Sequence, residues 1–361
     1  MAFTTIDNPE LYFQTKLYTG NGSTNAITLD GSENMQPDWV WLKVRSAGSG
    51  QDHTLYDSVR GATKFIESNT TNAEATGSNY LTSFDSNGFT LGNDQSHVNA
   101  SGDTYVAWNW KAGTSFTNDA RSTGIGSIDS TGSFNNDSGF SIVSYTGNNT
   151  SGATLKHGLN TAPAMVILRN RNLTNNRDTV VYHQKLTSAS YYIYLNSTGA
   201  MAGAYANFWN NTAPNSSVIT LGSGDTTTNG NGDTYIAYCF AEKQGYSKFG
   251  SYVGNGNATN NTFIYTGFKV GWVLIKRSSS SGEGWFIFDS TRSPANLNVN
   301  ELRADTNSVE TTGSHYIDFL SNGFKPKTAG AGIGGSGDTY IYMAFAENPF
   351  VTSTGVPATA R

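Results

Sequence analysis

The sequence predicts an all-β protein made of three tandem antiparallel modules, each a β-sandwich or jelly roll of about 100 residues. Three observations support this prediction. The 361 residues include 40 Gly and 19 Tyr, with many Asn, Ser and Thr, which is typical of short strands joined by turns. Apolar residues alternate along short segments. The same motifs also occur three times in the same order.

One motif, with the core Gly-Asp-Thr-Tyr, defines the repeat. It reads SGDTYVAWNW from Ser101, NGDTYIAYCF from Asn231 and SGDTYIYMAF from Ser336. A preceding block reads PDWVWLKVR, PAMVILRNR and VGWVLIKRS, and YTGNG, YTGNN or YVGNG opens each copy. A fourth block contains LYDSVRG, VYHQK or FIFDSTR, and an NGF turn occurs in the first and third copies. Four blocks in fixed order at nearly constant spacing indicate three homologous modules.

Side chains alternate within these blocks as they do in strands. In WVWLKVR both faces begin apolar, which predicts a central strand buried on both sides. In the GDTY strand one face carries large residues, and the other shrinks to Ala107, Ala237 or Ala344. The preceding Gly-Asp is turn chemistry, in which the aspartate accepts a hydrogen bond from the backbone two residues on. We expect each copy to contribute this strand to its own sandwich and its own hydrophobic core.

The blocks also divide the chain. The predicted parts are an N-terminal arm (1–14), module one (15–111), a Gly/Ser/Thr/Asn-rich linker or surface loop (112–139), module two (140–243), module three (244–348) and a C-terminal arm (349–361). Modules two and three join within a few residues, so their relative orientation is expected to be the more fixed. Three like modules also allow packing around one pseudo-threefold axis.

Longer segments combine these motifs. They are YTGNGST, QPDWVWLK, LYDSVRGATK, GDTYIAYCFAEKQGYSKFGSYVGNG, ELRADTNSVE and AENPFVTSTGVPATAR. In them the chain resembles a repeat family of virion- or tail-associated structural proteins of marine tailed bacteriophages, including phages of cyanobacteria. The resemblance covers nearly the whole chain and implies lectin-like β-sandwiches in a phage particle. It brings no set of functional residues, and the second copy departs from the pattern, with His183 where the others have Asp57 and Asp289.

Charge and composition exclude several classes of protein. The formal net charge of −5 argues against a general nucleic-acid-binding protein, which needs a basic face. Cys239 is the one cysteine, so the chain has no internal disulfide and no thiolate zinc site. The N-terminal MAFTTIDNPELYFQ lacks the apolar core of a signal peptide, and no apolar run is long enough to span a membrane. We expect a virion protein made in the host cytoplasm, with no membrane insertion.

The polar residues form no recognisable catalytic constellation. The five histidines have no helical metal-pair spacing, and no nucleophile-elbow motif occurs. Most acidic residues lie in turn contexts, and we interpret them as turn-forming residues. A polysaccharide-cleaving carboxylate pair and calcium in the Asx-rich turns stay open as alternatives. We expect no catalytic residue, no cofactor and no metal.

A basic pair follows each central strand. The three pairs are Lys43/Arg45, Arg169/Arg171 and Lys276/Arg277. We favour internal ion pairs with the aspartates of the next strand, Asp57 and Asp289, over a grip on an acidic glycan or a neighbouring capsid surface. Arg60 and Arg292 lie three residues beyond these aspartates and invite the same interpretation.

Aromatic residues supply the candidate contacts. Tryptophans matched by Met or Tyr in another copy are expected in the core. The candidates for an exposed contact, private to copy two, are Tyr191, Tyr192, Tyr194 and Trp209. The candidates for docking of an arm on another subunit or on a partner virion protein are Tyr12, Phe13, Phe350 and Val351.

These expectations combine into one functional hypothesis with alternatives. We expect a non-enzymatic structural protein that decorates the capsid or tail, as a homo-oligomer with other virion proteins as partners. The alternative is a lectin-like tail fibre or receptor-binding protein for host attachment, with a host surface glycan as partner. An enzyme that degrades surface polysaccharide is the more distant third.

Overall fold

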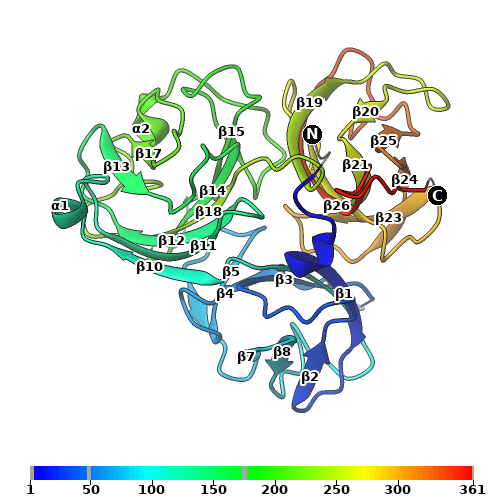
Figure 1. Cartoon of the computed structure of the whole chain (residues 1–361), viewed down its shortest axis with the longest axis horizontal. Helices are drawn as coiled ribbons and strands as arrows, with labels where there is room; N and C mark the ends of the chain where they lie inside the picture. The colour runs from blue at the N-terminus through cyan, green and yellow to red at the C-terminus, as the bar shows by residue number, and fades with distance from the viewer. Residues whose placement is uncertain (1–3, 47–49, 173–176, 360–361) are drawn as a thin grey trace.

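The computed structural model describes residues 4–46, 50–172 and 177–359. The protein is nearly all β, with 43% strand and 3% helix, and its sheets are antiparallel. The all-β prediction is therefore confirmed. Residues 15–111, 140–243 and 244–348 are called copies 1, 2 and 3 below, a division that is our interpretation of the sequence repeats. Figure 1 shows their ribbons as three lobes around a common centre.

The elements up to the end of copy 1 begin with the short helix η1 (Pro9–Leu11). The strands are β1 (Phe13–Thr19), β2 (Asn25–Thr28), β3 (Trp39–Val44), β4 (Thr54–Asp57), β5 (Lys64–Glu67), β6 (Ala75–Thr76), β7 (Leu81–Asp85), β8 (Gly88–Leu91) and β9 (Thr104–Trp110). They form a six-stranded sheet in the order β1-β9-β3-β4-β5-β6 and a three-stranded sheet in the order β2-β8-β7.

The next elements run to the end of copy 2. They are β10 (Thr114–Asn118), α1 (Ala120–Thr123), β11 (Ser130–Asn135), β12 (Phe140–Thr146), β13 (Ala153–Lys156), β14 (Met165–Asn170), β15 (Val180–His183), β16 (Ile193–Tyr194), α2 (Ala206–Trp209), β17 (Val218–Leu221) and β18 (Thr234–Phe240). The large sheet has the order β10-β11-β12-β18-β14-β15-β16, and β13 pairs with β17.

Copy 3 forms one eight-stranded sheet. Its strands are β19 (Ser247–Val253), β20 (Ile264–Tyr265), β21 (Phe268–Arg277), β22 (Trp285–Asp289), β23 (Asn298–Arg303), β24 (Thr311–Leu320), β25 (Gly323–Pro326) and β26 (Thr339–Pro349). Their order is β19-β26-β21-β22-β23-β24-β25-β20.

The large sheets share one strand order. In each, the first-block strand pairs with the GDTY strand, then the central strand, then the fourth-block strand. The register agrees as well, because Trp39 pairs with Trp110, Met165 with Phe240, and Trp272 with Phe345. Every residue of β3 and β14 is buried, as predicted for central strands with two covered faces. This register lets residues of the three copies be compared position by position.

The tyrosines of two motifs fix each copy in the same way. The GDTY tyrosine stacks on the first-block tyrosine, at 5.0 Å for Tyr18 and Tyr105 and 4.9 Å for Tyr145 and Tyr235. The Tyr105 hydroxyl accepts from the Ala100 amide at 2.9 Å, and the Tyr18 hydroxyl donates to the Val98 carbonyl at 2.7 Å. Copy 3 repeats the pair with Tyr252 and Tyr340, 4.9 Å apart. The tyrosines, more than the aspartate we expected, hold the loop before the GDTY strand.

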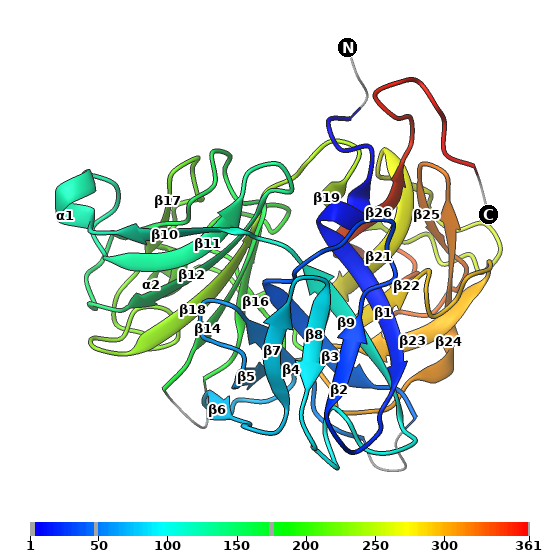
Figure 2. The same ribbon diagram turned by 60° about the horizontal axis from the view of Figure 1, so that its bottom comes forward.

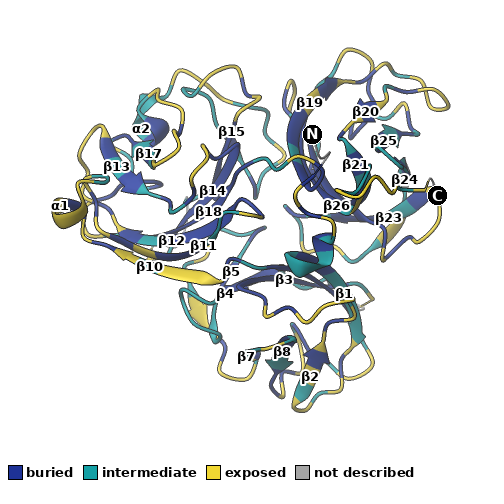
Figure 3. Ribbon diagram, viewed as in Figure 1, coloured by how far each residue is buried: buried dark blue, intermediate teal, exposed yellow. Residues whose placement is uncertain are grey.

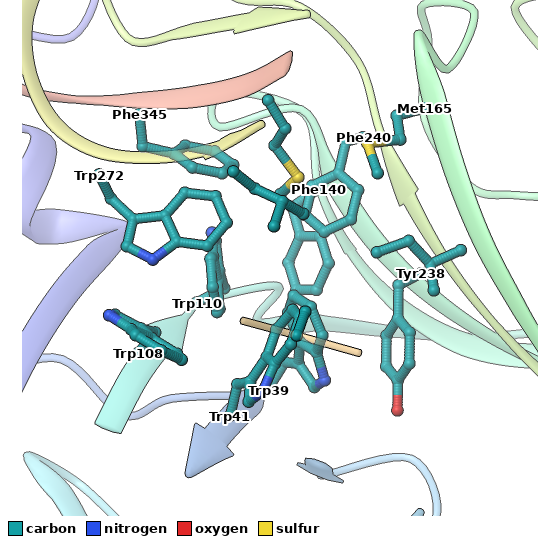
Figure 4. Close-up of a cluster of buried hydrophobic side chains, with 14 of the residues drawn as sticks. Trp39, Trp41, Trp108, Trp110, Phe140, Met165, Tyr238, Phe240, Trp272 and Phe345 are labelled. Atoms are coloured by element: carbon teal, nitrogen blue, oxygen red, sulfur yellow. The ribbon is translucent and has the colours of Figure 1, made fainter. Parts of the chain in front are cut away.

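The expectation of three separate cores is wrong for one face of each sheet. One apolar cluster extends through all three copies, from Ile6 to Phe345. Aromatic contacts cross every junction: Trp39 lies 4.5 Å from Tyr238, Trp110 lies 5.5 Å from Trp272, and Phe240 lies 6.2 Å from Phe345. Figure 4 shows these rings converging from strands of different copies. The inner faces of the large sheets therefore cover one another.

The opposite face of each large sheet covers a core within its own copy. These clusters centre on Val40 and Phe89 in copy 1, on Val166 and Trp209 in copy 2, and on Val273 and Phe324 in copy 3. The central strands are accordingly buried in Figure 3, with exposed residues concentrated in outer loops. Each central strand thus lies between a local core and the shared core.

Residues 112–139 are not an unstructured linker. They contain β10, α1 and β11, and β11 pairs along its length with β12. The segment has few large apolar residues because β10 lies at the edge of the sheet. Its main apolar contact is between the Phe116 and Phe134 rings, whose centroids lie 5.9 Å apart. Ser and Thr are compatible with such an exposed strand.

The N-terminal arm packs on its own chain. Tyr12 contacts Tyr246 at 6.0 Å, and Phe13 is buried and stacks on Phe345 at 5.2 Å. Their apolar surface is therefore not left wet, which was the reason for predicting that they dock elsewhere. At the same end of the molecule (Figure 2), the Asp7 carboxylate accepts from the Ser353 amide at 2.7 Å, and Phe350 and Val351 are half-buried.

Candidate functional site

The junctions between copies hold most of the buried charged groups, and we take them as the candidate functional site. At the junction of copies 1 and 2, the Tyr238 hydroxyl donates to Asp57 at 2.8 Å. At the junction of copies 3 and 1, the Trp108 indole N–H donates to Asp289 at 3.0 Å. Trp108 and Tyr238 occupy the same position of the GDTY strand. The two aspartates also match, because Asp57 pairs with Trp39 and Asp289 with Trp272. The contact therefore repeats from one junction to the next.

Each aspartate begins a chain of charges that ends on the neighbouring copy. Arg60 pairs with Asp57 at 2.5 Å and with Glu74 at 3.4 Å, and Glu74 pairs with Arg171 of copy 2 at 2.7 Å. The Asp57 and Arg60 side chains are fully buried. Burial is the largest single influence and lowers the Arg60 pKa, but Asp57, Tyr238 and Glu74 together outweigh it, and the pKa is raised. The Arg60 guanidinium therefore stays charged inside the protein.

The second junction has the same chain of charges. Arg292 pairs with Asp289 at 2.5 Å and with Glu310 at 2.9 Å, and Glu310 pairs with Arg45 of copy 1 at 2.7 Å. Backbone bonds accompany both chains, from the Glu74 amide to Arg171 and from the Glu310 amide to Arg45. The predicted pairing of Asp57 and Asp289 with Arg60 and Arg292 is confirmed.

The junction of copies 2 and 3 uses different chemistry at every matching position. His183 stands for the aspartate, Leu186 for the arginine, Met201 for the glutamate, Ser278 for the second arginine and Met343 for Tyr238 or Trp108. Met343 has no hydrogen to donate, and the His183 imidazole Nε2 bonds the Tyr342 carbonyl at 3.1 Å instead. The Met201 amide still donates to the Ser278 carbonyl at 3.0 Å. All five positions differ from the other junctions, so no charged group of the set is left buried here without a partner.

The basic pairs after the central strands act differently from the prediction. Their inner members, Lys43, Arg169 and Lys276, donate to backbone carbonyls of the neighbouring copy. Lys43 reaches Asn307 at 2.8 Å, and Lys276 reaches Ser197 at 3.3 Å. Burial lowers the pKa of Lys43 and of Lys276 to about 8. None of the three forms the predicted pair with the aspartate of the next strand.

The outer members of these pairs have different ion-pair partners at the two types of junction. Arg45 and Arg171 pair with glutamates of the neighbouring copy, as described above. Arg277 instead pairs with Asp338 of its own copy at 3.3 Å, because the strand register aligns Ser278, not Arg277, with those arginines.

The predicted surface contact in copy 2 is only partly exposed. Trp209 is 1% exposed and belongs to the core of copy 2, so it is wrong as an exposed contact. Tyr191, Tyr192 and Tyr194 are half-buried. Tyr192 packs on Phe208 at 4.6 Å, which makes these rings the border of that core. Their Asn-rich surroundings gave no signal of this burial.

Within the described ranges, no three His, Cys, Asp or Glu residues come together as metal ligands would. None of the helices described has the length and apolar character needed to cross a bilayer.

The sequence contains a pattern from which the junctions could have been predicted. Trp or Tyr in a GDTY strand accompanies Asp in the copy that contacts it, and Met accompanies His. We noted His183 as a departure, but the sequence did not tell us which strand it faces.

The chain matches the family described as a domain of unknown function, DUF7483, over residues 8–349, and it belongs to that family. The match extends across all three copies and both types of junction. Comparison with curated proteins and with solved structures gave no match.

Proposed function

We propose that this protein is a non-enzymatic structural component of a bacteriophage particle, where it decorates the capsid or tail as a rigid three-lobed unit. One observation carries the proposal: the charged groups buried between the copies bond to one another or to backbone groups. Asp57, Arg60 and Glu74 form such a chain, and the Asp57–Arg60 pair is closed to solvent. Groups arranged in this way hold sheets together and have no face free for a substrate.

The architecture supports a building block more than a flexible tether. The copies share a core, and residues 112–139 add two strands to a sheet instead of a linker. A unit of this kind presents its outer loops at fixed positions, which suits repeated contacts with other virion proteins. The resemblance in sequence supplies the phage context, and a homo-oligomer on the particle remains part of this proposal.

Electron microscopy of the particle tests the proposal. Particles that lack the gene should lose density of the size and three-lobed shape of this protein, and complementation should restore it. If purified wild-type particles contain no such protein, the structural role is wrong. Truncation at residue 351 should lower occupancy on the particle if the C-terminal residues contact a partner.

The alternative, a glycan-binding receptor protein, gives a different outcome. Deletion would then abolish adsorption to the host and leave the remaining particle intact. An activity against surface polysaccharide, the third hypothesis, would appear as reducing ends released by the purified chain.

A further inference from the structure

Two adjoining cavities lie along β19, at the side of copy 3 that faces copy 2. The first has a volume of about 540 Å³ and is lined from copy 2 by Gln184 and Lys185 and from copy 3 by Ser251 and Tyr342. The second has a volume of about 310 Å³ and is lined by Gln244, Tyr265 and Phe350 among others. Glu242 and Lys248 line both cavities. We call the pair the β19 groove.

An exposed aromatic ring stands at one end of the β19 groove. Tyr265 is 58% exposed, on the short edge strand β20. Tyr265 pairs with Gly323 as Thr28 pairs with Gly88 in copy 1, so the two positions match. Copy 1 thus has a small polar residue where copy 3 presents a ring. The ring is therefore not required by the repeated fold.

The polar groups beside this ring come in donor and acceptor pairs. The Lys248 ammonium contacts the Glu242 carboxylate at 2.5 Å, and both side chains are about one third exposed, at 37% and 33%. Gln244 adds an amide, which is both donor and acceptor. A sugar hydroxyl also donates and accepts at once, so neighbouring hydroxyls match a carboxylate next to an ammonium.

A separate cavity elsewhere on the protein lacks this combination of an exposed ring and paired polar groups. The cavity beside β11 and β12 also has a volume of about 310 Å³ and is lined by hydroxyl groups. Its aromatic residue, Tyr145, is 4% exposed and already stacked on Tyr235. It offers polar groups but no free ring face.

We propose that the β19 groove binds an oligosaccharide, with one sugar ring stacked on Tyr265 and its hydroxyls bonded to Glu242, Lys248 and Gln244. Apolar C–H faces of a sugar pack on an aromatic ring while its hydroxyls reach polar groups at the rim. Further sugar units extend along β19 toward Gln184 and Lys185 of copy 2. The site goes beyond the structural role proposed above and does not depend on it.

The test screens the purified full chain against defined hexose oligosaccharides by saturation-transfer NMR and measures the best probe by calorimetry. The Tyr265→Ala variant should bind about tenfold more weakly, which corresponds to about 1.4 kcal/mol, because the stacking ring is lost. Glu242→Gln should also weaken binding. Two matched controls should bind as the wild type: Phe263→Ala, an exposed ring on the same edge (44% exposed), and Thr28→Ala, the matching position of copy 1.

Three results would overturn the proposal. The first is the absence of binding by the wild type to every oligosaccharide at millimolar concentration. The second is unchanged affinity in Tyr265→Ala. The third is equal weakening by Tyr265→Ala and Phe263→Ala, which would indicate a general effect of exposed rings. Retained thermal melting in each variant shows that the fold is intact, and a failed screen leaves the particle experiment unaffected.

Discussion

At the scale of single residues, the GDTY motif has its clearest physical basis in its tyrosine. The hydroxyls of Tyr105, Tyr235 and Tyr340 accept from backbone amides at 2.9, 2.6 and 2.9 Å. The preceding glycines, Gly102 and Gly232, have φ of 86° and 81°, which side chains other than glycine rarely adopt. The motif therefore joins a left-handed turn to a ring that fastens the loop before it.

Replacing the tyrosine hydroxyl tests this explanation. We expect Tyr235→Phe to lower the free energy of unfolding by about 1–2 kcal/mol, because the Gly230 amide loses the Tyr235 hydroxyl and the Thr226 carbonyl loses one of two donors while the ring stays packed. Urea unfolding measures the change. If Asp233→Ala is more damaging than Tyr235→Phe, then the aspartate is the main support of the turn.

The buried ion pair of copy 1 gives a larger effect. Asp57→Ala leaves Arg60 charged and without its main partner, and breaking such a pair costs about 3–5 kcal/mol. Asp30→Ala is the matched control. The Asp30 side chain is 74% exposed and pairs with Lys16. Surface ion pairs of this kind contribute less than about 1 kcal/mol to the free energy of unfolding. Chemical unfolding of both variants makes the comparison, and equal midpoints would contradict it.

Residue identities were predictable where packing follows from the pattern. The strand pattern, with Met or Tyr at the matching positions of another copy, placed Trp39 and Trp108 in the core, and both are fully buried. The same reasoning missed Trp209, because a helix of four residues leaves no periodicity to detect. The partner of Asp57 across the junction was also missed, since strand pattern gives no information on which sheet lies opposite.

At the scale of elements, the three junctions show two solutions to one packing problem. Two carry the chain Asp–Arg–Glu–Arg, and the third has His183, Leu186, Met201 and Ser278 at the matching positions. Replacing a buried ionic set with apolar residues of similar volume is often neutral or stabilising, whereas removing one member is not. The repeat within the chain therefore provides its own natural comparison.

This comparison leads to a prediction about exchange of a junction. We expect Arg60→Leu alone to cost several kcal/mol, because buried Asp57 loses its cation and Glu74 keeps only Arg171. The set Asp57→His, Arg60→Leu, Glu74→Met, Arg171→Ser and Tyr238→Met should recover most of that loss, since it reproduces the third junction. Urea unfolding of this combined variant and of its five single variants provides the measurement. If the loss of unfolding free energy in the variant with all five substitutions equals the sum of the losses in the single variants, the substitutions are independent and the prediction is wrong.

The elements themselves were predictable to different degrees. Central strands and GDTY strands follow from their apolar pattern and lie where expected. β10 and β11 were missed because their residues are mostly Ser, Thr and Gly, which composition assigns to loops. Pairing with β12 supplies the stability that their side chains do not.

At the scale of the whole molecule, the shared core changes what a single copy can do. Isolated copy 2 would expose the inner face of its sheet, including Phe140, Met165, Ile167 and Phe240. We predict that residues 114–243 alone bind a hydrophobic dye and lack near-ultraviolet circular dichroism, unlike the full chain. Cooperative melting of this fragment at the temperature of the full chain, without dye binding, would mean that the shared core contributes little.

The response to acid is the last prediction at this scale, and it rests on three buried neutral histidines. His53, His157 and His183 each have Nε2 next to a backbone carbonyl, at 3.0, 3.0 and 3.1 Å, so Nε2 carries the proton. Nδ1 accepts from the Trp41 indole in His53 and from a backbone amide in the other two, so a second proton there would meet a donor. Burial is the main cause that lowers the pKa of His157 and His183 to about 4, and that of His53 well below its ordinary value.

The sign of the effect follows from these shifts. As pH falls below about 6.5, the unfolded chain takes up protons that the folded protein refuses until about pH 4. The contribution of these histidines to the free energy of unfolding should therefore be constant above pH 7, fall between about pH 6.5 and 4, and level off below. For a pKa lowered from 6.5 to about 4, the loss is on the order of 3 kcal/mol per histidine. His53 and His183 bond carbonyls of the neighbouring copy, so the loss falls largely on the junctions. Urea midpoints at pH 7.0, 5.5 and 4.5 measure the slope, and His183→Gln, which keeps a donor and an acceptor at this position, should reduce it. An unchanged slope in His183→Gln would place the acid sensitivity outside this junction.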